Sequence, residues 1–490
     1  MKTVCVIGSS HGAILAVDKL LETGKFKIKV IDVNSFGTSN TKLHLESLNV
    51  GSDFNLSPTR YFGFGGTSNL WHGVVTDFDR EDWNQINKHC DYDLATDVHK
   101  YFVNVDNKFG VDSSLFRSDS SKNLGANLGQ KKKYVIQTSP FRTLSVLESF
   151  KSNTNIDLVE NSIALYFKSQ KLSDSDEVIQ SLVLFDRVSN KQKEVTADFY
   201  ILSAGALESP RLLLQSKHNG FLKFSSNAIG ENLMDHPWAI IGEIGPKRAL
   251  DKILGIGFDK SLNRRLKFRT ALRVQEPQLT NLLNHTISVK PNYGVDYNDF
   301  MSIIKDLITK SGNSYSLIEL LTRYKFIDIL KVGLVLLSEK FNINLKYDRG
   351  YVYAYLEQIP IKESLVSLSN TYDEYGRNIP KINWNLHDSG CYESMKFIND
   401  YCIRYFTSIG VDYISVADGA KLISGSHHAG TLRIGKNSDN GCIDTNLKLF
   451  GVTNLFVCDG SIFPYFGNAN PSYLINVFSL RLGCFIADNY

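Results

Sequence analysis

Two adjacent histidines, His427 and His428, form the most chemically versatile group in the chain. An imidazole has an ordinary pKa near neutrality, so it can accept a proton from a hydroxyl group, bind a metal ion or pack as a hydrogen-bonded core residue. A core or metal role is the more common one for such a pair. A metal would need further ligands, and neither His236 nor the scattered carboxylates offers ligand spacing, so we predict no metal site. Residue types alone leave the proton-accepting and structural roles open.

A tight turn at residues 8–13 has the residue types of a phosphate-binding loop. An apolar strand enters the turn and an amphipathic helix leaves it, so free backbone N–H groups and the positive end of the helix dipole face an anion. Against the dinucleotide-binding pattern G-x-G-x-x-G/A, the chain has Gly8, Ser10 and Ala13, so only the first glycine is kept and the third position holds the permitted small residue. Ser10 must turn its side chain away from a pyrophosphate or donate its hydroxyl to it, and Gly12 relieves some crowding.

Asp32 ends the next apolar strand, at the spacing where a carboxylate receives the ribose hydroxyls of an adenosine. Its negative charge disfavours a 2′-phosphate at that place. A strand-end aspartate is also a common turn former. Residues 4–32 therefore predict a parallel βαβ unit with a dinucleotide site, but they do not distinguish NAD from FAD.

Strand–turn–helix units recur in the centre and near the end of the chain. Residues 199–202 form an apolar strand that enters the turn Ser203-Ala204-Gly205 and then a helix. Residues 454–461 form a short apolar strand that ends in Asp-Gly and is followed by a helix over 473–488. These units predict a discontinuous Rossmann-like domain, and hence an α/β fold. We expect this domain to comprise residues 1–90, 150–238 and 415–490.

The middle of the chain, residues 239–414, predicts an inserted α+β substrate domain built on an antiparallel sheet. Alternating apolar residues at 351–356 and 365–369 are typical of strands in such a sheet. Two amphipathic stretches at 300–309 and 317–341, within a helical insertion at 299–341, pack on this core or form a lid or partner surface. Residues 91–149 are expected to form a connection or lid region, in which the polar stretch 112–133 is a surface connection without a core face.

Composition excludes several classes of protein. With 490 residues, 43% hydrophobic residues and 21% charged residues, the chain is neither fibrous nor disordered. Its net charge of +3 argues against a nucleic-acid-binding protein. Seven cysteines without metal-ligand spacing, and no visible signal peptide, favour a cytoplasmic location. The apolar stretch 326–337 contains Asp328 and Lys331 and is too short to span a membrane.

Five motifs spread over the chain indicate a family. They are GGTSNLW at 65–71, SAGALESPR at 203–211, IGENLMDHP at 229–237, HHAGTLRIG at 427–435, and DGSIFP with NANP between 459 and 471. Their combination and order resemble the glucose-methanol-choline (GMC) family of FAD-dependent oxidoreductases. The resemblance covers roughly residues 1–238 and 351–490, and it implies FAD as the cofactor.

The resemblance implies cofactor-binding residues of three kinds. Those at the ADP half of FAD are Gly8, Ser9, Ser10, His11, Ala13, Asp32 and, beside the adenine, Ala164. Those along the pyrophosphate and flavin are Gly65, Gly66, Thr67, Ser68 and Asn69. Those in turns that close over the ribose and pyrophosphate are Ala204, Gly205, Asp459 and Gly460. Asn470 and Pro471 would lead a helix whose positive end stabilises the reduced, anionic flavin.

The family's chemistry is the oxidation of an alcohol by hydride transfer to flavin N5, and this reaction needs a general base. His427 matches the family's base, three residues before a Gly-Thr turn, and Asn470 matches the polar partner that orients the hydroxyl. Trp71 and His72 are expected in the substrate pocket, together with His428 in a secondary role. The implied activity is an FAD-dependent alcohol dehydrogenase or oxidase.

The motifs GGTSNLW and YLEQ, the latter at 355–358, more weakly resemble the sugar- and polyol-oxidising branch. Some members of that branch carry a flavin-linking histidine where this chain has Leu70, so we predict non-covalent FAD. The expected partner is a small alcohol or sugar, with oxygen, a quinone or a redox protein left open as electron acceptor. Two alternatives remain: a non-oxidative lyase or isomerase on the same scaffold, and a flavin-stabilised binding protein that docks through the 300–341 helices.

Overall fold

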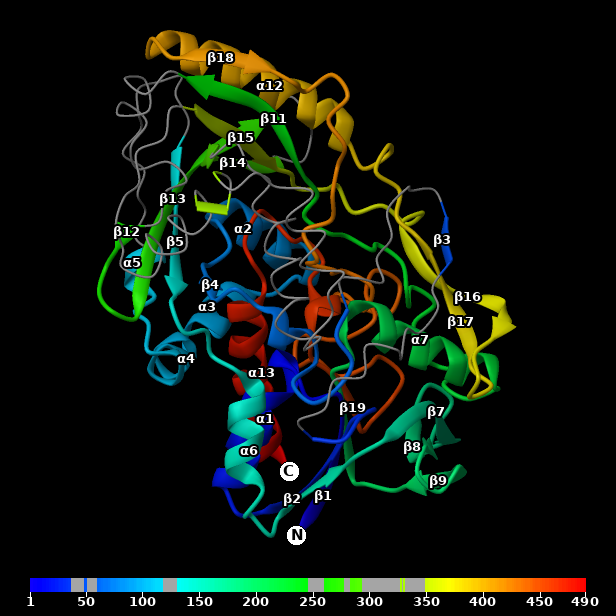
Figure 1. The fold of residues 1–490 in the computed structure, drawn as a ribbon. Helices are drawn as coiled ribbons and strands as arrows, with labels where there is room; N and C mark the ends of the chain where they lie inside the picture. Colours follow the sequence, from blue (N-terminus) through cyan, green and yellow to red (C-terminus); the bar gives the residue numbers. More distant parts are fainter. Residues whose placement is uncertain are drawn as a thin grey trace.

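A parallel sheet of five strands forms the base of the computed structural model, which describes residues 1–36, 48–50, 60–117, 130–245, 260–276, 283–292, 327, 329–330 and 349–490 (Figure 1). The strand order is β19-β10-β1-β2-β6. The bounds are β1 Lys2–Ile7, β2 Phe26–Ile31, β6 Ile156–Val159, β10 Phe199–Leu202 and β19 Leu455–Val457. The sheet thus joins N-terminal, central and C-terminal strands, and the predicted discontinuous Rossmann-like fold is confirmed. The residue boundaries given for the domains stay predictions.

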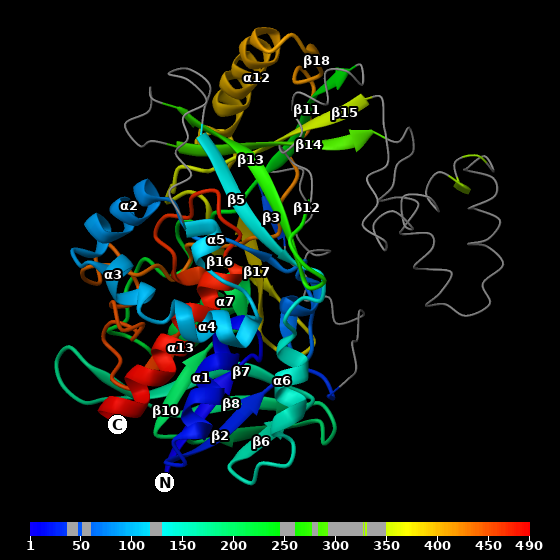
Figure 2. The same ribbon diagram turned by 90° about the vertical axis from the view of Figure 1, so that its left-hand side faces the viewer.

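Helices α1 (His11–Glu22) and α13 (Ser472–Asn489) pack side by side against this sheet (Figure 2). Helix α1 lies very close to the segment that follows β19. A Cβ added to Gly12 would lie only 1.7 Å from the Cys458 carbonyl oxygen. Gly8 has a φ of +90°, and a Cβ there would lie 2.3 Å from the Ser203 oxygen. The two glycines therefore let three segments of the chain meet at one edge of the sheet.

The second large sheet has eight strands and is antiparallel, in the order β18-β11-β15-β14-β13-β5-β4, with β12 paired to β13. The bounds are β4 Val74–Val75, β5 Gln130–Gln137, β11 Trp238–Gly245, β12 Lys260–Ser261, β13 Leu266–Glu276, β14 Leu283–Asn292, β15 Arg349–Tyr355 and β18 Asp412–Ser415. Helix α12 (Cys391–Ser408) packs against it at the top of Figure 1. The predicted antiparallel sheet is confirmed, with β4 and β5 added from before the insertion.

One expected surface connection is partly a strand. Of the stretch 112–133, the structure describes 112–117 and 130–133, and the latter residues begin β5. Lys132 is buried there and lies 3.2 Å from Asp79. The prediction of a stretch without a core face is therefore wrong at this point, because an ion pair compensates the burial of the lysine.

Two three-stranded sheets and several helices complete the described fold. The strands are β3 Leu48–Val50, β16 Leu365–Tyr372 and β17 Asn378–Asn383 in one sheet, and β7 Ser162–Lys171, β8 Glu177–Asp186 and β9 Lys191–Val195 in the other. The helices are α2 Arg80–Cys90, α3 Leu94–His99, α4 Phe102–Phe109, α5 Ser114–Arg117, α6 Thr143–Phe150, α7 Gly205–His218, and the 3₁₀ turns η2 Gly66–Leu70 and η3 Gly460–Ile462. The strand predicted at 365–369 thus pairs with β17 outside the large sheet.

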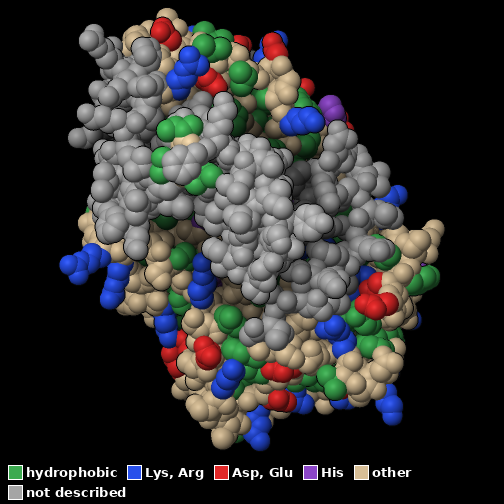
Figure 3. Space-filling model, viewed as in Figure 1, with side chains coloured by type: hydrophobic (Ala, Val, Ile, Leu, Met, Phe, Trp, Pro, Cys, Tyr) green, Lys and Arg blue, Asp and Glu red, His purple; other side chains and the backbone are tan. Residues whose placement is uncertain are grey.

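The helices predicted at 300–309 and 317–341 lie outside the described residues, apart from 327, 329 and 330. In the part of the chain that is described, no helix has the length and apolar character needed to cross a bilayer. The same residues contain no cluster of three metal-ligating side chains. Charged side chains of both signs are dispersed over the lower half of the visible face (Figure 3).

Candidate functional site

Two adjoining cavities lie at the edge where the parallel sheet meets the antiparallel sheet. The first, of about 260 Å³, is bordered by the carboxyl ends of β1, β2 and β10, and the second, of about 720 Å³, by the antiparallel sheet. Thr67, Ser426, His427 and Ser472 line both cavities. A ligand in one cavity therefore lies next to a ligand in the other, with His427 between them.

Most of the residues predicted to bind the cofactor line the first cavity. They are Gly8, Ser9, Ser10, His11, Asp32, Gly66, Thr67, Ser68, Ala164, Ala204, Gly205, Asp459, Gly460 and Pro471. Four do not line it: Ala13, Gly65, Asn69 and Asn470. Ala13 is buried within α1, Gly65 and Asn69 shape the loop behind the wall, and Asn470 lines the second cavity.

Asp32 and Ser9 join the glycine turn to the η2 loop. The Ser9 hydroxyl donates to Asp32 Oδ2 at 2.5 Å, and the Gly65 N–H donates to Ser9 Oγ at 2.8 Å. Burial raises the pKa of Asp32 to about 6, although hydrogen bonds from Ser9 and Val33 lower it. A carboxyl group held this way is a ready acceptor for hydroxyl donors of a ligand.

Asp459 makes hydrogen bonds in two further turns, the one after β10 and the one after β19. Its Oδ2 accepts from the Gly205 N–H at 2.9 Å and from the Ser209 hydroxyl at 2.6 Å, and its Oδ1 accepts from the Ser461 N–H at 2.8 Å. Burial raises the pKa of this carboxyl above its ordinary value. Asp459 therefore fixes the turn that follows β10 against the turn that follows β19.

His11 and Ser203, on the wall of the first cavity, each have a buried polar atom without a hydrogen-bond partner among the described residues. His11 Nδ1 accepts from the Asn476 amide at 2.6 Å, which leaves the proton on Nε2, and Nε2 is unpaired. Burial lowers the pKa of His11 to about 3, so the ring is neutral. Ser203 Oγ is also unpaired. A polar ligand would satisfy both groups, so the donor set fits a phosphate-bearing dinucleotide such as FAD.

His427 is the best-placed base between the two cavities. Its Nδ1 lies 3.2 Å from Nδ1 of His236, and its Nε2 lies 3.1 Å from the Asn470 amide nitrogen. Burial lowers the pKa of His427 to about 4, although the Asp235 carboxylate raises it. The imidazole is therefore neutral at physiological pH and can accept a proton.

The partners of His236 determine which nitrogen of His427 carries the proton. A carbonyl oxygen only accepts, so Phe466 O, 3.3 Å away, takes the proton of His236 Nε2. Burial, and then His427, lower the pKa of His236 to about 3, so its Nδ1 is a lone-pair acceptor. His427 must then donate from Nδ1, which leaves its Nε2 lone pair facing Asn470 and the second cavity.

Asp235 holds the backbone of both histidines in place. Its Oδ1 accepts from the N–H of His427 at 2.8 Å and of His236 at 2.7 Å, and its Oδ2 accepts from the Ser424 hydroxyl. Burial raises the pKa of Asp235, but the neighbouring His428 and His427 bring it below its ordinary value. Sequence reasoning did not select Asp235, and it considered His236 only as a metal ligand. Both lie in the IGENLMDHP motif, which was the available signal.

The predicted substrate-pocket residues separate into two places. Trp71 and His72 line the second cavity, whereas His428 lines the first. His428 Nε2 lies 3.8 Å from Asp235 Oδ2. His428 therefore lies apart from Trp71 and His72, with which it was expected in the substrate pocket, and lines the other cavity.

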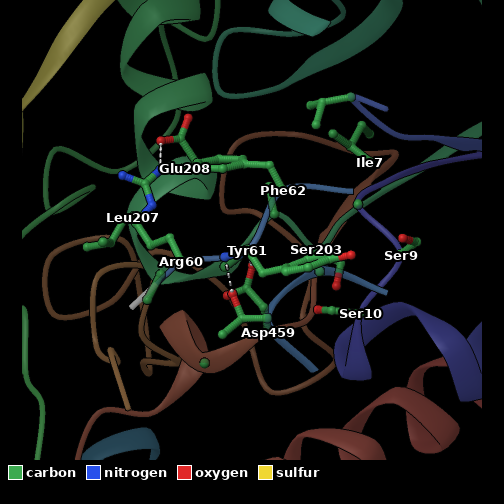
Figure 4. Close-up of a pocket in the computed structure, with 18 of the residues that line it drawn as sticks. Ile7, Ser9, Ser10, Arg60, Tyr61, Phe62, Ser203, Leu207, Glu208 and Asp459 are labelled. Carbon is green, nitrogen blue, oxygen red and sulfur yellow. Dashed lines mark hydrogen bonds and ion pairs between the residues drawn. The ribbon is translucent and has the colours of Figure 1, made fainter. Parts of the chain in front are cut away.

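A buried ion network on the first cavity's wall escaped the sequence analysis. Arg60 is turned toward Glu208 (Figure 4), and Arg211 lies 3.2 Å from Glu208 and 2.9 Å from Asp373. Arg377 donates to the Ala164 carbonyl at 3.2 Å. Burial would raise the pKa of Glu208, but the arginines lower it to about 2. Glu208 and Arg211 are three residues apart on α7, and Asp373 and Arg377 are four apart, but no spacing links these pairs to each other or to Arg60 and Ala164.

Comparison with known proteins gives a consistent result. Residues 406–479 match the family model described as GMC oxidoreductase. The 2-methyl-1,2-propanediol dehydrogenase of Mycolicibacterium austroafricanum is 22% identical over 312 residues, 62% of this chain and 50% of that protein. The long-chain-alcohol oxidase FAO3 of Arabidopsis thaliana is 35% identical over 83 residues, 16% of this chain and 11% of that protein. The chain thus spans half or less of these curated relatives.

Solved structures with the same fold cover the whole chain. The pyridoxine 4-oxidase from Mesorbium loti superposes with a TM-score of 0.63 at 15% identity, over 100% of both chains. A formate oxidase superposes with a TM-score of 0.56 at 14% identity, over 100% of this chain and 98% of that one. At these identities the similarity establishes the fold.

Proposed function

We propose that this chain, which belongs to the GMC oxidoreductase family, binds FAD in the first cavity and oxidises an alcohol in the second. The observation that supports this most is the place of His427, a neutral buried imidazole that lines both cavities. A base at that boundary can act on a hydroxyl group next to a bound flavin.

The residues that would hold FAD are those of the first cavity. Asp32 would accept the ribose hydroxyls, the glycine turn at 8–13 and the N-terminus of α1 would face the pyrophosphate, and the N-terminus of α13 would face the flavin. When bound, FAD supplies the acceptor for a hydride. We propose non-covalent attachment, because Leu70 offers no nucleophilic atom.

His427 would remove the hydroxyl proton of the substrate. In the structure the Asn470 amide N–H donates to His427 Nε2 at 3.1 Å. A substrate hydroxyl in the second cavity would replace this bond, donating to Nε2 and accepting from the Asn470 amide. Removing this proton makes it easier for a hydride to leave the carbon atom. The resulting imidazolium keeps its Nδ1–H bond to His236 and lies near the Asp235 carboxylate, which stabilises the positive charge.

The second cavity supports a hydroxyl-rich substrate, in keeping with the sugar or polyol resemblance. Five residues that carry side-chain hydroxyls line it: Tyr134, Thr286, Ser288, Tyr353 and Tyr355. A relative named for a diol, 2-methyl-1,2-propanediol dehydrogenase, supports the same class.

Anaerobic mixing of the purified holoprotein with sugars, polyols and simple alcohols tests the proposal. Acid precipitation should first release the yellow cofactor into the supernatant. At least one alcohol should then bleach the flavin band, and admission of air should restore it only if oxygen is the acceptor. A colourless protein that takes up no FAD would refute the cofactor proposal. Bound FAD that no alcohol bleaches would instead favour the lyase or isomerase alternative.

His236→Leu should lower kcat by about 10- to 100-fold and leave KM less affected, because nothing would then fix the tautomer of His427. His236→Asn keeps an oxygen acceptor near the Nδ1 position, so it should recover much of the rate. Steady-state kinetics of both variants with a bleaching alcohol provide the measurement. Equal rates in the two variants would mean that His236 serves packing only.

A further inference from the structure

The irregular segment 466–470 carries two of the groups that the proposed reaction uses. The Phe466 carbonyl oxygen accepts from His236 Nε2 at 3.3 Å, and the two rings stack with their centres 4.2 Å apart. At the other end of the segment, the Asn470 amide donates to His427 Nε2 at 3.1 Å. The segment lies in no helix or strand. Contacts with the rest of the chain therefore decide where these two groups lie.

Lys132 and Asp82 contact the middle of this segment from two distant elements. The Lys132 ammonium, on β5, donates to Asn468 Oδ1 at 2.5 Å. Asp82, on α2, lies against Gly467, because a Cβ added to this glycine would lie 2.3 Å from Asp82 Oδ2. Gly467 also has a φ of +50°, which favours glycine. The segment is thus held between a strand of the antiparallel sheet and a helix.

The ammonium of Lys132 is buried and charged. The side chain is only 5% exposed, and its Nζ lies 3.2 Å from Asp79 Oδ1. Burial alone would lower the pKa of Lys132, but the neighbouring acids, chiefly Asp79, raise it above its ordinary value. An ammonium group only donates, so its bond to Asn468 Oδ1 is charge-assisted and about twice as strong as a neutral one.

Asp79 holds Lys132 in turn. Its Oδ2 lies 3.1 Å from Arg273 Nε, and Arg273 lies 2.6 Å from Glu81. Two cations and two carboxylates therefore alternate in a row that begins at Lys132 and joins β5, β13 and the start of α2. Each charge in the row is compensated by its neighbours, which keeps the ammonium at a fixed point.

This row of charges ends beside the second cavity. Asn468, Asn470 and Tyr134 all line that cavity. Lys132 and Tyr134 are two residues apart on β5, so their side chains leave the same face of the strand. The bond from Lys132 to Asn468 therefore acts on the wall of the second cavity, two residues from the amide that meets the base.

We propose that Lys132 is a positioning residue for the alcohol oxidation, and that it acts through its bond to Asn468. The bond would keep segment 466–470 where the Asn470 amide meets His427. This proposal rests on the proposed function and adds to it a residue that lines neither cavity. A displacement of about 1 Å can cost about 100-fold in rate. Breaking the bond should therefore slow hydride transfer more than it weakens the binding of the alcohol.

Anaerobic stopped-flow reduction of the flavin tests the proposal in Lys132→Met, Asn468→Leu and the double variant, with an alcohol that bleaches the wild-type flavin. Each single variant should lower the limiting reduction rate by about 10- to 100-fold, with a smaller change in the dissociation constant of the alcohol. The double variant should be no slower than the slower single variant, because both changes break one bond. Asn468→Asp keeps an acceptor oxygen for Lys132 and should retain most of the rate.

Asn454→Leu is the matched control for Asn468→Leu. Asn454 is buried, lines neither cavity, and makes side-chain hydrogen bonds of 2.8 and 3.1 Å with the backbone of Ile179. Its loss should lower the stability to urea and leave the limiting reduction rate unchanged. Should Lys132→Met fail to fold, the two Asn468 variants still decide, since they leave the ion pair of Lys132 with Asp79 in place.

Four results would overturn the positioning proposal. They are a limiting rate for Asn468→Leu equal to that of Asn454→Leu, a change in the dissociation constant alone, an Asn468→Asp variant as slow as Asn468→Leu, and losses that multiply in the double variant. In each of these cases the wild-type flavin is bleached, so the proposed function stands. If no alcohol bleaches the wild-type flavin, the proposed function fails and the positioning role fails with it.

Discussion

His427→Gln should lower turnover by about 10²- to 10⁴-fold, the usual effect of losing a general base. Glutamine has similar length and hydrogen-bonding capacity, but its amide does not take up a proton. The residue lines the first cavity without any predicted hydrogen bond to the pyrophosphate or ribose, so FAD should remain bound. Anaerobic stopped-flow reduction of the flavin by a bleaching alcohol measures the step directly. The exposed His387→Gln is the matched control, and a rate for His427→Gln equal to that of this control would reject the assignment.

The same residue sets the expected pH dependence. Burial lowers the pKa of His427 to about 4, so the basic form predominates above that pH and is lost as the pH falls through it. The kcat/KM of the wild-type enzyme should therefore stay level through neutral pH and fall only near pH 4. A fall near pH 6.5, where an ordinary histidine titrates, would show that His427 is more solvated in solution than in this structure.

Gly12→Ala should destabilise the protein by about 3 kcal/mol or more, at or above the upper range for overpacking. The new methyl group would lie 1.7 Å from the Cys458 carbonyl oxygen, so α1 must move away from the end of β19. That movement also displaces the turn that faces the cofactor, and FAD should dissociate more readily. Urea unfolding followed by far-UV circular dichroism, together with FAD release, provides the measurement.

Gly24→Ala is the control for the Gly12 prediction. Gly24 has a φ of +67°, and a Cβ there meets nothing within 4 Å, so only the backbone strain of about 1–2 kcal/mol is expected. A loss of stability in Gly12→Ala no greater than in this control would show that the contact between α1 and β19 relaxes easily.

The fold was predictable where the sequence is locally unambiguous. Parallel strands are buried on both faces, so β1, β10 and β19 stand out as short apolar runs that enter turns. Strand β5 did not stand out because three lysines fill its first half, at 131–133. The burial of Lys132 depends on Asp79, more than fifty residues earlier. An ion pair of that kind exists only once the chain has folded.

The residues of the candidate site likewise divide into those that a local motif predicts and those that only the fold brings together. Motifs predicted His427, Asn470 and the turns because each is a short local pattern. His236 is 191 residues from His427, and no spacing rule links the two.

The arrangement of the parallel sheet has a consequence for biosynthesis. The central strand β1 is made first, but one neighbour, β10, begins at residue 199, and the next strand in the sheet, β19, begins at residue 455. Until those segments have emerged from the ribosome, the apolar edge of β1 and the face of α1 that packs on α13 remain exposed to solvent. Nascent chains of this protein should therefore depend on chaperones for most of translation. Stalled chains should aggregate through strand β1 and helix α1.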